Sequence, residues 1–384
     1  MTWKMLRKDF SKYASRCGYS CAVGITLTDI GALAGVSTAT VSRVLNNKPG
    51  VGATTRQSVL VAVQTLGYEV PEPLRPRFSD LVAMIVPELE NPVFPHFAQV
   101  ISLGLAQHGY TSVLCTQTAG TAGEDQYVQM LLDRQVAGII FVSGIHAVAA
   151  TDISRYTSLT ERKLPIVLIN GYLNGVDAPF VSNDDATAVD LAVAHLVQLG
   201  HRQIGLALGQ RRYTPTIRKM AGFAAAMERH VGVDAETSQH LVECTTFSVE
   251  GGSAAAQTLL DRGCTALVCG SDLMALGVIR AVHQRGLTVP GDVSVVGSDD
   301  SSLLPFTDPP LTTVRQPVAA MGNAAVRALL DLISGGPAPR AEYLFRPELV
   351  VRGSTAAAPA GENRAATSRT SEIRIRLPTP AQKP

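Results

Sequence analysis

The chain has 384 residues, of which 46% are hydrophobic and 17% charged, so it is long enough for two or three domains with buried cores. The formal net charge is only +1, so bulk charge does not indicate a polyanionic partner. The six cysteines form no C-x-x-C pair and no run of about eighteen apolar residues occurs, so we expect reduced thiols in a cytoplasmic protein, with no zinc site, cofactor or membrane helix.

Residues 1–24 contain basic side chains but neither a continuous apolar core nor a clear periodicity. They do not form a convincing signal peptide. We expect a disordered extension, or a start codon assigned too early with the true start near Val23. N-terminal sequencing of the native protein distinguishes the two.

Residues 25–68 have the pattern of short helices. Thr26 and Asp29 have the T-x-x-D spacing of a capping box, which predicts the start of a first helix. Gly35 can end that helix because it tolerates a positive φ. Ser37 then has the position of a cap for a second helix.

The second helix separates an apolar face from an outward face. Val41, Val44 and Leu45 fall at i, i+3 and i+4, which predicts that they face inward. The outward face consists of small or polar side chains and one arginine: Thr38, Ala39, Ser42 and Arg43. A third helix is expected from about Thr54 to Leu66. This arrangement indicates a helix-turn-helix, and a three-helix bundle without a ligand is the alternative.

From Leu81 to about Gly353, short apolar runs alternate with longer amphipathic segments. The runs suit strands buried on both faces of a parallel sheet, and they lie at 81–87, 111–117, 138–143, 165–170, 203–209, 266–271 and 293–299. Helices are expected between them, among others at 124–135, 185–199, 249–262 and 272–286. Because one open sheet rarely holds so many strands, two similar, doubly wound α/β lobes are predicted. Residues 354–384 are poor in large apolar side chains, which predicts a disordered tail.

Residues 29–46, "DIGALAGVSTATVSRVLN", closely resemble the N-terminal domain of the LacI/GalR family of bacterial transcription repressors, with Gly31 in place of an alanine. The stretches "GSDLMALGVIRAVHQRGLTVPGDVSVVGSDD" and "PPLTTVRQP" carry the resemblance further, so it covers roughly residues 25–353. It implies a periplasmic-binding-protein-like sensor and dimerisation domain at 81–353. The implied N-lobe comprises about 81–181 and 318–345, and the implied C-lobe about 182–316 and 346–353.

The resemblance implies binding to double-stranded operator DNA. Thr38, Ala39 and Arg43 fall where family members read bases, and an arginine can bond a guanine bidentately. The candidate phosphate contacts are Ser37, Thr40, Ser42, Asn46 and Thr55. Residues 25–80 carry five basic and four acidic side chains, so a monomer should bind weakly. A homodimer, or a higher oligomer, on a palindromic site is therefore expected.

Family members usually follow the third helix with a hinge helix whose leucine wedges into the minor groove. Here the segment 69–80 contains three prolines, which leave little room for a helix and favour an extended linker. We predict little or no hinge helix even on operator DNA. Leu74 is still a candidate wedge and Arg75 a candidate DNA contact, and a spacer with solvated charges is the alternative.

The lobes of this family close around a small-molecule effector at the carboxyl ends of their strands. The resemblance places effector-binding residues at Asn91, Phe94, Phe97, Ser143, Lys219, Phe247, Ser271, Asp299 and Gln316. Lys219 stands where the family has an arginine, so a bidentate fork is lost. Phe94 and Phe97 fit the lobe core equally well. Asp272 is predicted to cap its helix and not to contact the ligand.

Motifs for a catalytic nucleophile, a phosphate-binding loop or a metalloprotease are absent from the sequence, so catalysis is not indicated. We therefore predict a nucleoid-associated transcription repressor controlled by a small carbohydrate or a related metabolite. The alternative is a sugar-binding module or a sugar-metabolising enzyme without DNA function. The sequence shows neither an export signal nor a catalytic constellation for that alternative.

Overall fold

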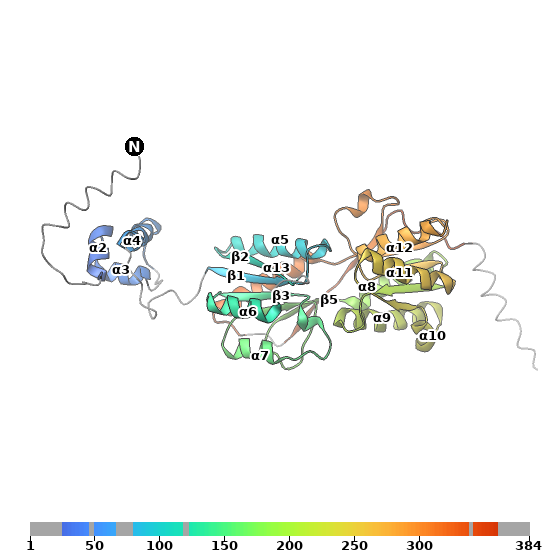
Figure 1. The fold of residues 1–384 in the computed structure, drawn as a ribbon, viewed down its shortest axis with the longest axis horizontal. Helices are drawn as coiled ribbons and strands as arrows, with labels where there is room; N and C mark the ends of the chain where they lie inside the picture. Colours follow the sequence, from blue (N-terminus) through green and yellow to red (C-terminus); the bar gives the residue numbers. More distant parts are fainter. Residues whose placement is uncertain (1–24, 46–49, 67–79, 118–122, 338–340, 360–384) are drawn as a thin grey trace, which may run out of the picture. The chain divides into compact units, whose positions relative to one another are not determined.

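The computed structural model describes residues 25–45, 50–66, 80–117, 123–337 and 341–359. The chain divides into two compact units, Met1–Arg77 and Phe78–Pro384, which we describe one at a time (Figure 1). The predicted extension at 1–24 and nearly all of the predicted linker lie outside the described residues. The same holds for three candidate DNA contacts, namely Asn46, Leu74 and Arg75.

The described part of the small unit consists of helices α2 (Leu27–Ala34), α3 (Thr38–Leu45) and α4 (Ala53–Leu66). The Asp29 carboxylate accepts the backbone N–H and the hydroxyl of Thr26 at 2.8 and 2.7 Å, so the predicted capping box is confirmed. Gly35 follows α2 with a φ of 67°, in the left-handed region. The Ser37 hydroxyl oxygen accepts the N–H of Thr40 at 3.2 Å, which confirms the predicted second cap.

A small apolar core joins these helices and confirms the predicted inward face of α3. Its buried side chains are Ile30, Val41, Val44, Leu45, Val59 and Ala62. Gly31 is buried too, and a Cβ there would lie 2.8 Å from the carbonyl oxygen of Val36. The glycine that replaces the family's alanine thus lets the turn pack closely on α2.

The large unit contains two six-stranded sheets with helices on both faces. The first sheet has the order β11-β5-β4-β3-β1-β2, and all its pairs are parallel. Its strands are β1 (Leu81–Val86), β2 (Thr111–Thr116), β3 (Gly138–Val142), β4 (Ile166–Ile169), β5 (Phe180–Asn183) and β11 (Glu342–Phe345). Two helices, α5 (Val93–Ala106) and α13 (Val318–Ile333), cover one face, and α6 (Glu124–Asp133) and α7 (Ser154–Glu161) cover the other (Figure 1).

The second sheet has the order β12-β10-β9-β8-β6-β7, and only its β10–β12 pair is antiparallel. Its strands are β6 (Ile204–Leu208), β7 (Val242–Cys244), β8 (Ala266–Cys269), β9 (Ser294–Asp299), β10 (Thr312–Arg315) and β12 (Glu348–Val350). One face carries α8 (Asp185–Gln198) and α9 (Thr214–Val231), with the short α10 (Ala235–Gln239) beyond them, and the other carries α11 (Val249–Asp261) and α12 (Asp272–Gln284). The chain passes between the lobes after β5, after β10 and after β11.

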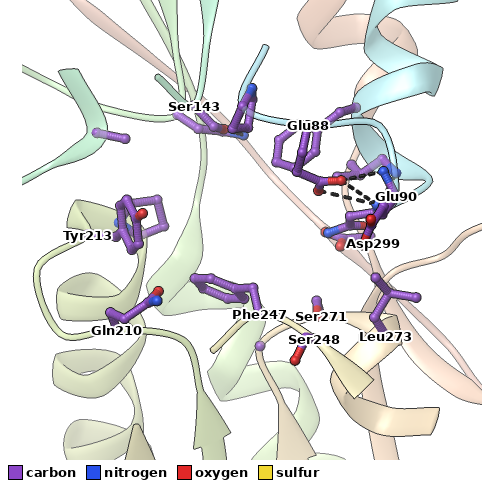
Figure 2. A pocket seen from close by; sticks show the side chains of 18 of the residues that line it. Glu88, Glu90, Ser143, Gln210, Tyr213, Phe247, Ser248, Ser271, Leu273 and Asp299 are labelled. Atoms are coloured by element: carbon purple, nitrogen blue, oxygen red, sulfur yellow. Dashed lines mark hydrogen bonds between the residues drawn. The ribbon is translucent and has the colours of Figure 1, made fainter. Parts of the chain in front are cut away.

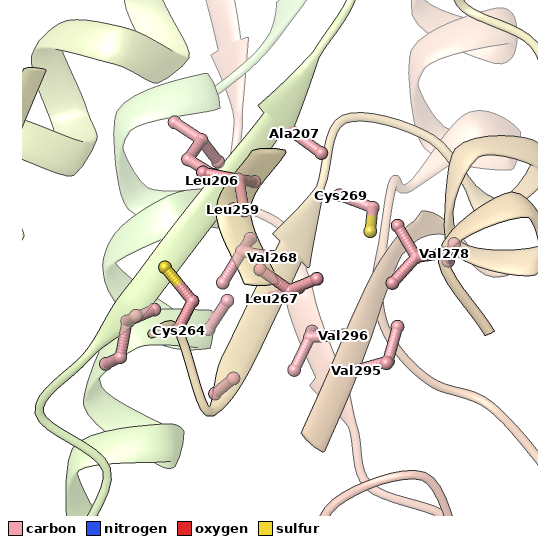
Figure 3. Close-up of a cluster of buried hydrophobic side chains, with 14 of the residues drawn as sticks. Leu206, Ala207, Leu259, Cys264, Leu267, Val268, Cys269, Val278, Val295 and Val296 are labelled. Carbon is pink, nitrogen blue, oxygen red and sulfur yellow. The ribbon is translucent and has the colours of Figure 1, made fainter. Parts of the chain in front are cut away.

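Apolar strand side chains fill the core on both sides of the second sheet, as Leu206, Leu267, Val268 and Val296 illustrate (Figure 3). This explains why the strands read as nearly continuous apolar runs. The strands and helices predicted for the large region are confirmed within a few residues at their ends. The pattern missed β5, β7, β10, β11 and β12, because these strands are only three or four residues long and mix polar with apolar side chains.

The chain continues as an ordered strap on the second lobe beyond β12. Ser354 is fully buried. Its hydroxyl donates to the carbonyl oxygen of Val295 at 2.6 Å and accepts the N–H of Thr312 at 2.8 Å. The N–H of Ala358 donates to the carbonyl oxygen of Leu199 at 2.8 Å.

The predicted start of a disordered tail at residue 354 is therefore wrong. Residues 354–359 are held by hydrogen bonds of the backbone and of side-chain hydroxyls, among them those of Ser354 and Ser294, and such contacts leave no apolar pattern in the sequence. Residues 360–384 lie outside the described part of the chain.

Replacing Ser354 with alanine should lower the free energy of unfolding by about 1–3 kcal/mol, because two buried backbone groups lose their partner. Urea denaturation monitored by circular dichroism measures the change. Ala357→Ser alters an exposed strap residue and should change the stability by less than about 0.5 kcal/mol. Equal stability of Ser354→Ala and wild type would contradict the role of the hydroxyl.

Candidate functional site

The exposed face of α3 gathers the side chains predicted to contact DNA. Ser37, Thr38, Ala39 and Arg43 are all exposed there, and no ion pair of Arg43 occurs among the described residues. Thr40 and Ser42 on the same helix, and Thr55 on α4, are half-buried. The exposed face of α3 therefore carries one guanidinium group, and the start of the helix carries small, uncharged side chains.

The large unit contains a cavity of about 540 Å³ between its two lobes (Figure 2). Its wall is formed by residues at or just after the carboxyl ends of parallel strands from both sheets: Glu88, Ser143, Asn170, Gln210, Ser271 and Asp299. In Figure 2, Glu88 and Asp299 lie toward one end of the cavity and Gln210 and Tyr213 toward the other. Ligands of parallel α/β sheets bind at this edge.

Three of these strand ends have an unusual backbone conformation. Ser143, Asn170 and Asp299 have φ values of 47°, 63° and 108°, in a region that residues other than glycine rarely adopt. All three line the cavity. Such strained conformations cost about 1–3 kcal/mol each and cluster at binding sites, which supports a functional role for this edge.

An amide chain links the two lobes across the cavity. The side-chain nitrogen of Asn170 donates to the Gln316 amide oxygen at 3.2 Å and to the Ser143 hydroxyl at 3.3 Å. The Gln316 nitrogen donates to the Asp299 carboxylate at 3.2 Å. Because Gln316 lies where the chain crosses from β10 to α13, the position of the lobes and the polar wall of the cavity depend on one another.

Phe247 forms an aromatic wall of the cavity. A Cβ on Gly209 would collide with its ring, and a Cβ on Gly270 would lie 3.2 Å from it, so the two glycines make room for the ring. The Tyr213 ring lies beside it with a centroid distance of 6.2 Å. Two neighbouring aromatic rings provide an apolar surface for a ring-shaped ligand.

Lys219 on α9 and Asp185 on α8 form a buried ion pair in the cavity wall. The nearby Asp299 carboxyl has a pKa raised well above its usual range by burial and by the charge of Asp272, and Lys219 lowers it in part. The wall thus contains one lysine and five acidic side chains, of which Asp185 is buried, Glu88 and Asp299 are half-buried, and Glu90 and Glu250 are exposed.

Ser271, not Asp272, caps α12: its hydroxyl oxygen accepts the N–H of Met274 at 3.3 Å. The carboxylate of Asp272 is buried, and it accepts the Thr313 hydroxyl at 2.7 Å and the Ser301 N–H at 2.8 Å. Burial raises its pKa to about 6. The cap prediction for Asp272 is wrong because a distant strand and loop occupy its carboxylate.

The cavity brings together eight of the nine predicted effector residues, namely Asn91, Phe94, Ser143, Lys219, Phe247, Ser271, Asp299 and Gln316. Phe97 is fully buried in the core under α5 and is absent from the cavity wall, so the effector-binding prediction is wrong for Phe97 and its core interpretation is right. The sequence reasoning missed further lining residues: Glu88, Asn170, Asp185, Gln210 and Tyr213. Their signal in the sequence is a polar residue at or soon after the end of a strand.

Within the described ranges, no group of three or more histidine, cysteine, aspartate or glutamate side chains is arranged to hold a metal ion. None of the described helices is long and apolar enough to cross a membrane.

An exposed helix-turn-helix followed by two α/β lobes around a polar cavity defines a ligand-sensing, DNA-binding regulator. Residues 26–70 match the model of bacterial regulatory proteins of the lacI family, and residues 193–355 match that of a periplasmic binding protein-like domain. The transcriptional regulator MalR of Streptomyces coelicolor is 59% identical over 339 residues, which cover 88% of this chain and 98% of MalR. The repressor CytR of Escherichia coli K12 is 33% identical, over 87% of this chain and 97% of CytR. The chain belongs to the LacI family of bacterial transcriptional regulators.

Solved structures of regulators have the same architecture. The CelR–cellobiose complex is 31% identical with a TM-score of 0.63, and the match covers 86% of this chain and 99% of CelR. The lac repressor dimer bound to operator and an anti-inducer is 28% identical with a TM-score of 0.66, and the match covers 87% and 99%. The predicted fold class and the prediction of a transcriptional regulator, not an enzyme, are confirmed.

The pKa of Asp272 makes stability depend on pH. Because its folded pKa of about 6 exceeds the ordinary value of 3.8, the folded state holds this proton longer than the unfolded state. The free energy of unfolding should fall by about 1–3 kcal/mol relative to Asp272→Asn as the pH rises from about 4 to about 6. Urea denaturation across this range measures the difference, with Asp331→Asn on an exposed residue of α13 as the control. Parallel stability curves for wild type and Asp272→Asn would contradict the assignment.

Proposed function

We propose that this regulator is a cytoplasmic repressor that binds a palindromic operator as a homodimer or higher oligomer, and that a small carbohydrate in the cavity controls this binding. The observation that carries the proposal is the cavity of about 540 Å³, in which polar strand ends from both lobes surround an aromatic wall. This volume falls within the roughly 300–1,000 Å³ of typical small-molecule sites.

The DNA-binding face supports a reader of the major groove. Thr38 and Ala39 are short, so the start of α3 can approach base edges closely, and they offer little beyond contact with a thymine methyl group. Arg43 then carries most of the direct readout on this helix. Ser37, Thr40, Ser42 and Thr55 are proposed phosphate contacts, and they fix the position of the helix without reading sequence.

A carbohydrate suits the composition of the cavity. Asn170, Gln316 and Asp299 offer amide donors and carboxylate acceptors for hydroxyl groups, and Phe247 offers a face for the carbons of a sugar ring. Among the structural relatives, CelR was solved with cellobiose, and a LacI-family regulator of Enterococcus faecium, 25% identical with a TM-score of 0.63, with bound ribose.

The cavity wall supports allosteric control. A ligand that contacts residues of both lobes binds one lobe arrangement more tightly than another, and only such a difference can shift the DNA-binding equilibrium. The Asn170–Gln316–Asp299 chain is a set of contacts that the ligand would join or replace. Leu74 and Arg75, in the segment 69–80, are proposed to contact DNA.

Arg43→Ala should weaken binding to the operator by about 10- to 100-fold, because a bidentate contact with a guanine contributes about 1–3 kcal/mol. A gel shift at low salt, on the DNA that flanks the protein's own gene, measures the loss. Arg134→Ala removes an exposed arginine outside the DNA-binding domain and should leave binding unchanged. Equal shifts by wild type and Arg43→Ala, or no shift by wild type, would refute the repressor proposal.

The loop around η3 (Leu304–Phe306) is proposed to contribute to the dimer interface. Leu303 and Phe306 are 68% and 85% exposed, which is unusual for large apolar side chains in water. Phe306→Glu should shift the protein toward monomers and weaken operator binding, as measured by analytical ultracentrifugation and gel shift. The matched control is Val351→Glu, on an apolar residue that is 56% exposed. An unchanged dimer in Phe306→Glu would remove this loop from the interface.

A further inference from the structure

We propose that the cavity selects neutral polyhydroxylated ligands and rejects anionic ones, such as sugar phosphates and sugar acids, and that Asp185 sets this preference by neutralising Lys219. The inference rests on the proposed function, because it concerns the cavity to which the effector is assigned. It names the chemical class of the effector and one residue that determines specificity.

The charges around the cavity are unbalanced. Lys219 is the one basic side chain among the described residues of the wall. The acidic side chains of the wall are Glu88, Glu90, Asp185, Glu250 and Asp299. An anionic ligand placed in this cavity would meet no unpaired cation, and each ionised carboxylate near it would repel it.

The lysine is not available to compensate a ligand charge. Its ammonium group forms the ion pair with Asp185, and the two residues are only 9% and 6% exposed. The positive charge of Lys219 also lowers the pKa of the Asp299 carboxyl group in part. An anion that approached the ammonium group would have to displace a buried carboxylate from it, and an unpaired buried charge is strongly unfavourable.

The helix ends around the cavity are occupied as well. The N-termini of α5, α8, α11 and α12 meet at the cavity, and such ends ordinarily attract anions. Side chains of the protein already lie at each of them. Glu88 accepts the N–H of Asn91 at 2.9 Å before α5, and Asp184 caps α8. Ser248 caps α11, with Glu250 in its first turn, and Ser271 caps α12.

The remaining helix, α9, has no acidic residue in its first turn. However, its start contains Pro215, which has no N–H to offer, and its cation is the paired Lys219. A neutral ligand with many hydroxyl groups avoids these conflicts. Its hydroxyl protons can bond the carboxylates and its oxygens can accept from the amides of Asn170 and Gln316.

A single isosteric change tests this account without knowledge of the effector. Asp185→Asn removes the carboxylate charge, keeps the side-chain volume and leaves Lys219 unpaired. Inorganic phosphate is the probe, added to the full-length protein at constant ionic strength and followed by thermal shift and calorimetry. Asp185→Asn should bind phosphate at least about tenfold more tightly than wild type, and the gain should vanish in Asp185→Asn with Lys219→Met.

Two controls separate this effect from others. The double variant keeps the DNA-binding domain intact, so phosphate bound there affects all variants equally. Glu250→Gln removes a wall carboxylate that has no ion pair among the described residues, and its gain should be smaller than that of Asp185→Asn. If wild type binds phosphate as tightly as Asp185→Asn, or if the folded Asp185→Asn variant gains nothing, the proposal is overturned.

Matched sugar pairs test the same preference on the wild-type protein, so the proposal does not depend on whether a variant folds. The pairs are cellobiose with cellobionate and ribose with ribose 5-phosphate. The neutral member of a bound pair should bind at least about tenfold more tightly, and equal or tighter binding of the anion overturns the proposal. If neither member of either pair binds, these two sugars fail as effectors, while the phosphate experiment still decides whether Asp185 masks Lys219.

Discussion

The amide of Gln316 joins the two lobes of this regulator at the cavity, because it accepts from Asn170 of the first lobe and donates to Asp299 of the second. The constraint behind it is that parallel sheets place all their carboxyl ends along one edge, so two such sheets joined by crossovers must bring polar strand ends face to face. The positive φ values of Ser143, Asn170 and Asp299 are the local cost of this arrangement. A ligand in the cavity meets groups whose positions already depend on how the lobes are held.

Burial raises the pKa of two acidic groups at this edge of the second sheet. The second sheet is covered on both faces, so Asp272 and Asp299 lie in surroundings that disfavour their charged forms, and the pKa of each is raised. The protein satisfies these groups with hydroxyl, amide and ammonium partners from different elements. Burial makes the ionised forms of these carboxyl groups unfavourable, and the same groups can form hydrogen bonds with the hydroxyl groups of a ligand. The carboxyl groups that affect the stability of the C-lobe therefore also affect which ligands the cavity accepts.

In the small unit, the ends of the helices are set by residues that lie close together in the sequence. Caps at Thr26 and Ser37 and a glycine turn at Gly35 fix where α2 ends and α3 begins. Burial of Val41, Val44 and Leu45 then leaves the opposite face of α3 exposed, with Arg43 on it. The caps and the turn depend on residues within a few positions of one another, so the sequence pattern and the structure agree at these positions.

The sequence by itself determined the helix-turn-helix, the long buried strands and the family, because caps, periodicity and motifs are properties of neighbouring residues. Only the tertiary structure decided that Phe94 lines the cavity while Phe97 lies in the core, that Asp272 binds a loop and a strand and not its own helix end, and that Lys219 is paired with Asp185. It also showed that residues 354–359 pack on the second lobe. These outcomes depend on which side chains, more than thirty positions apart in most cases, the crossovers bring into contact, and no local pattern in the chain encodes that distance.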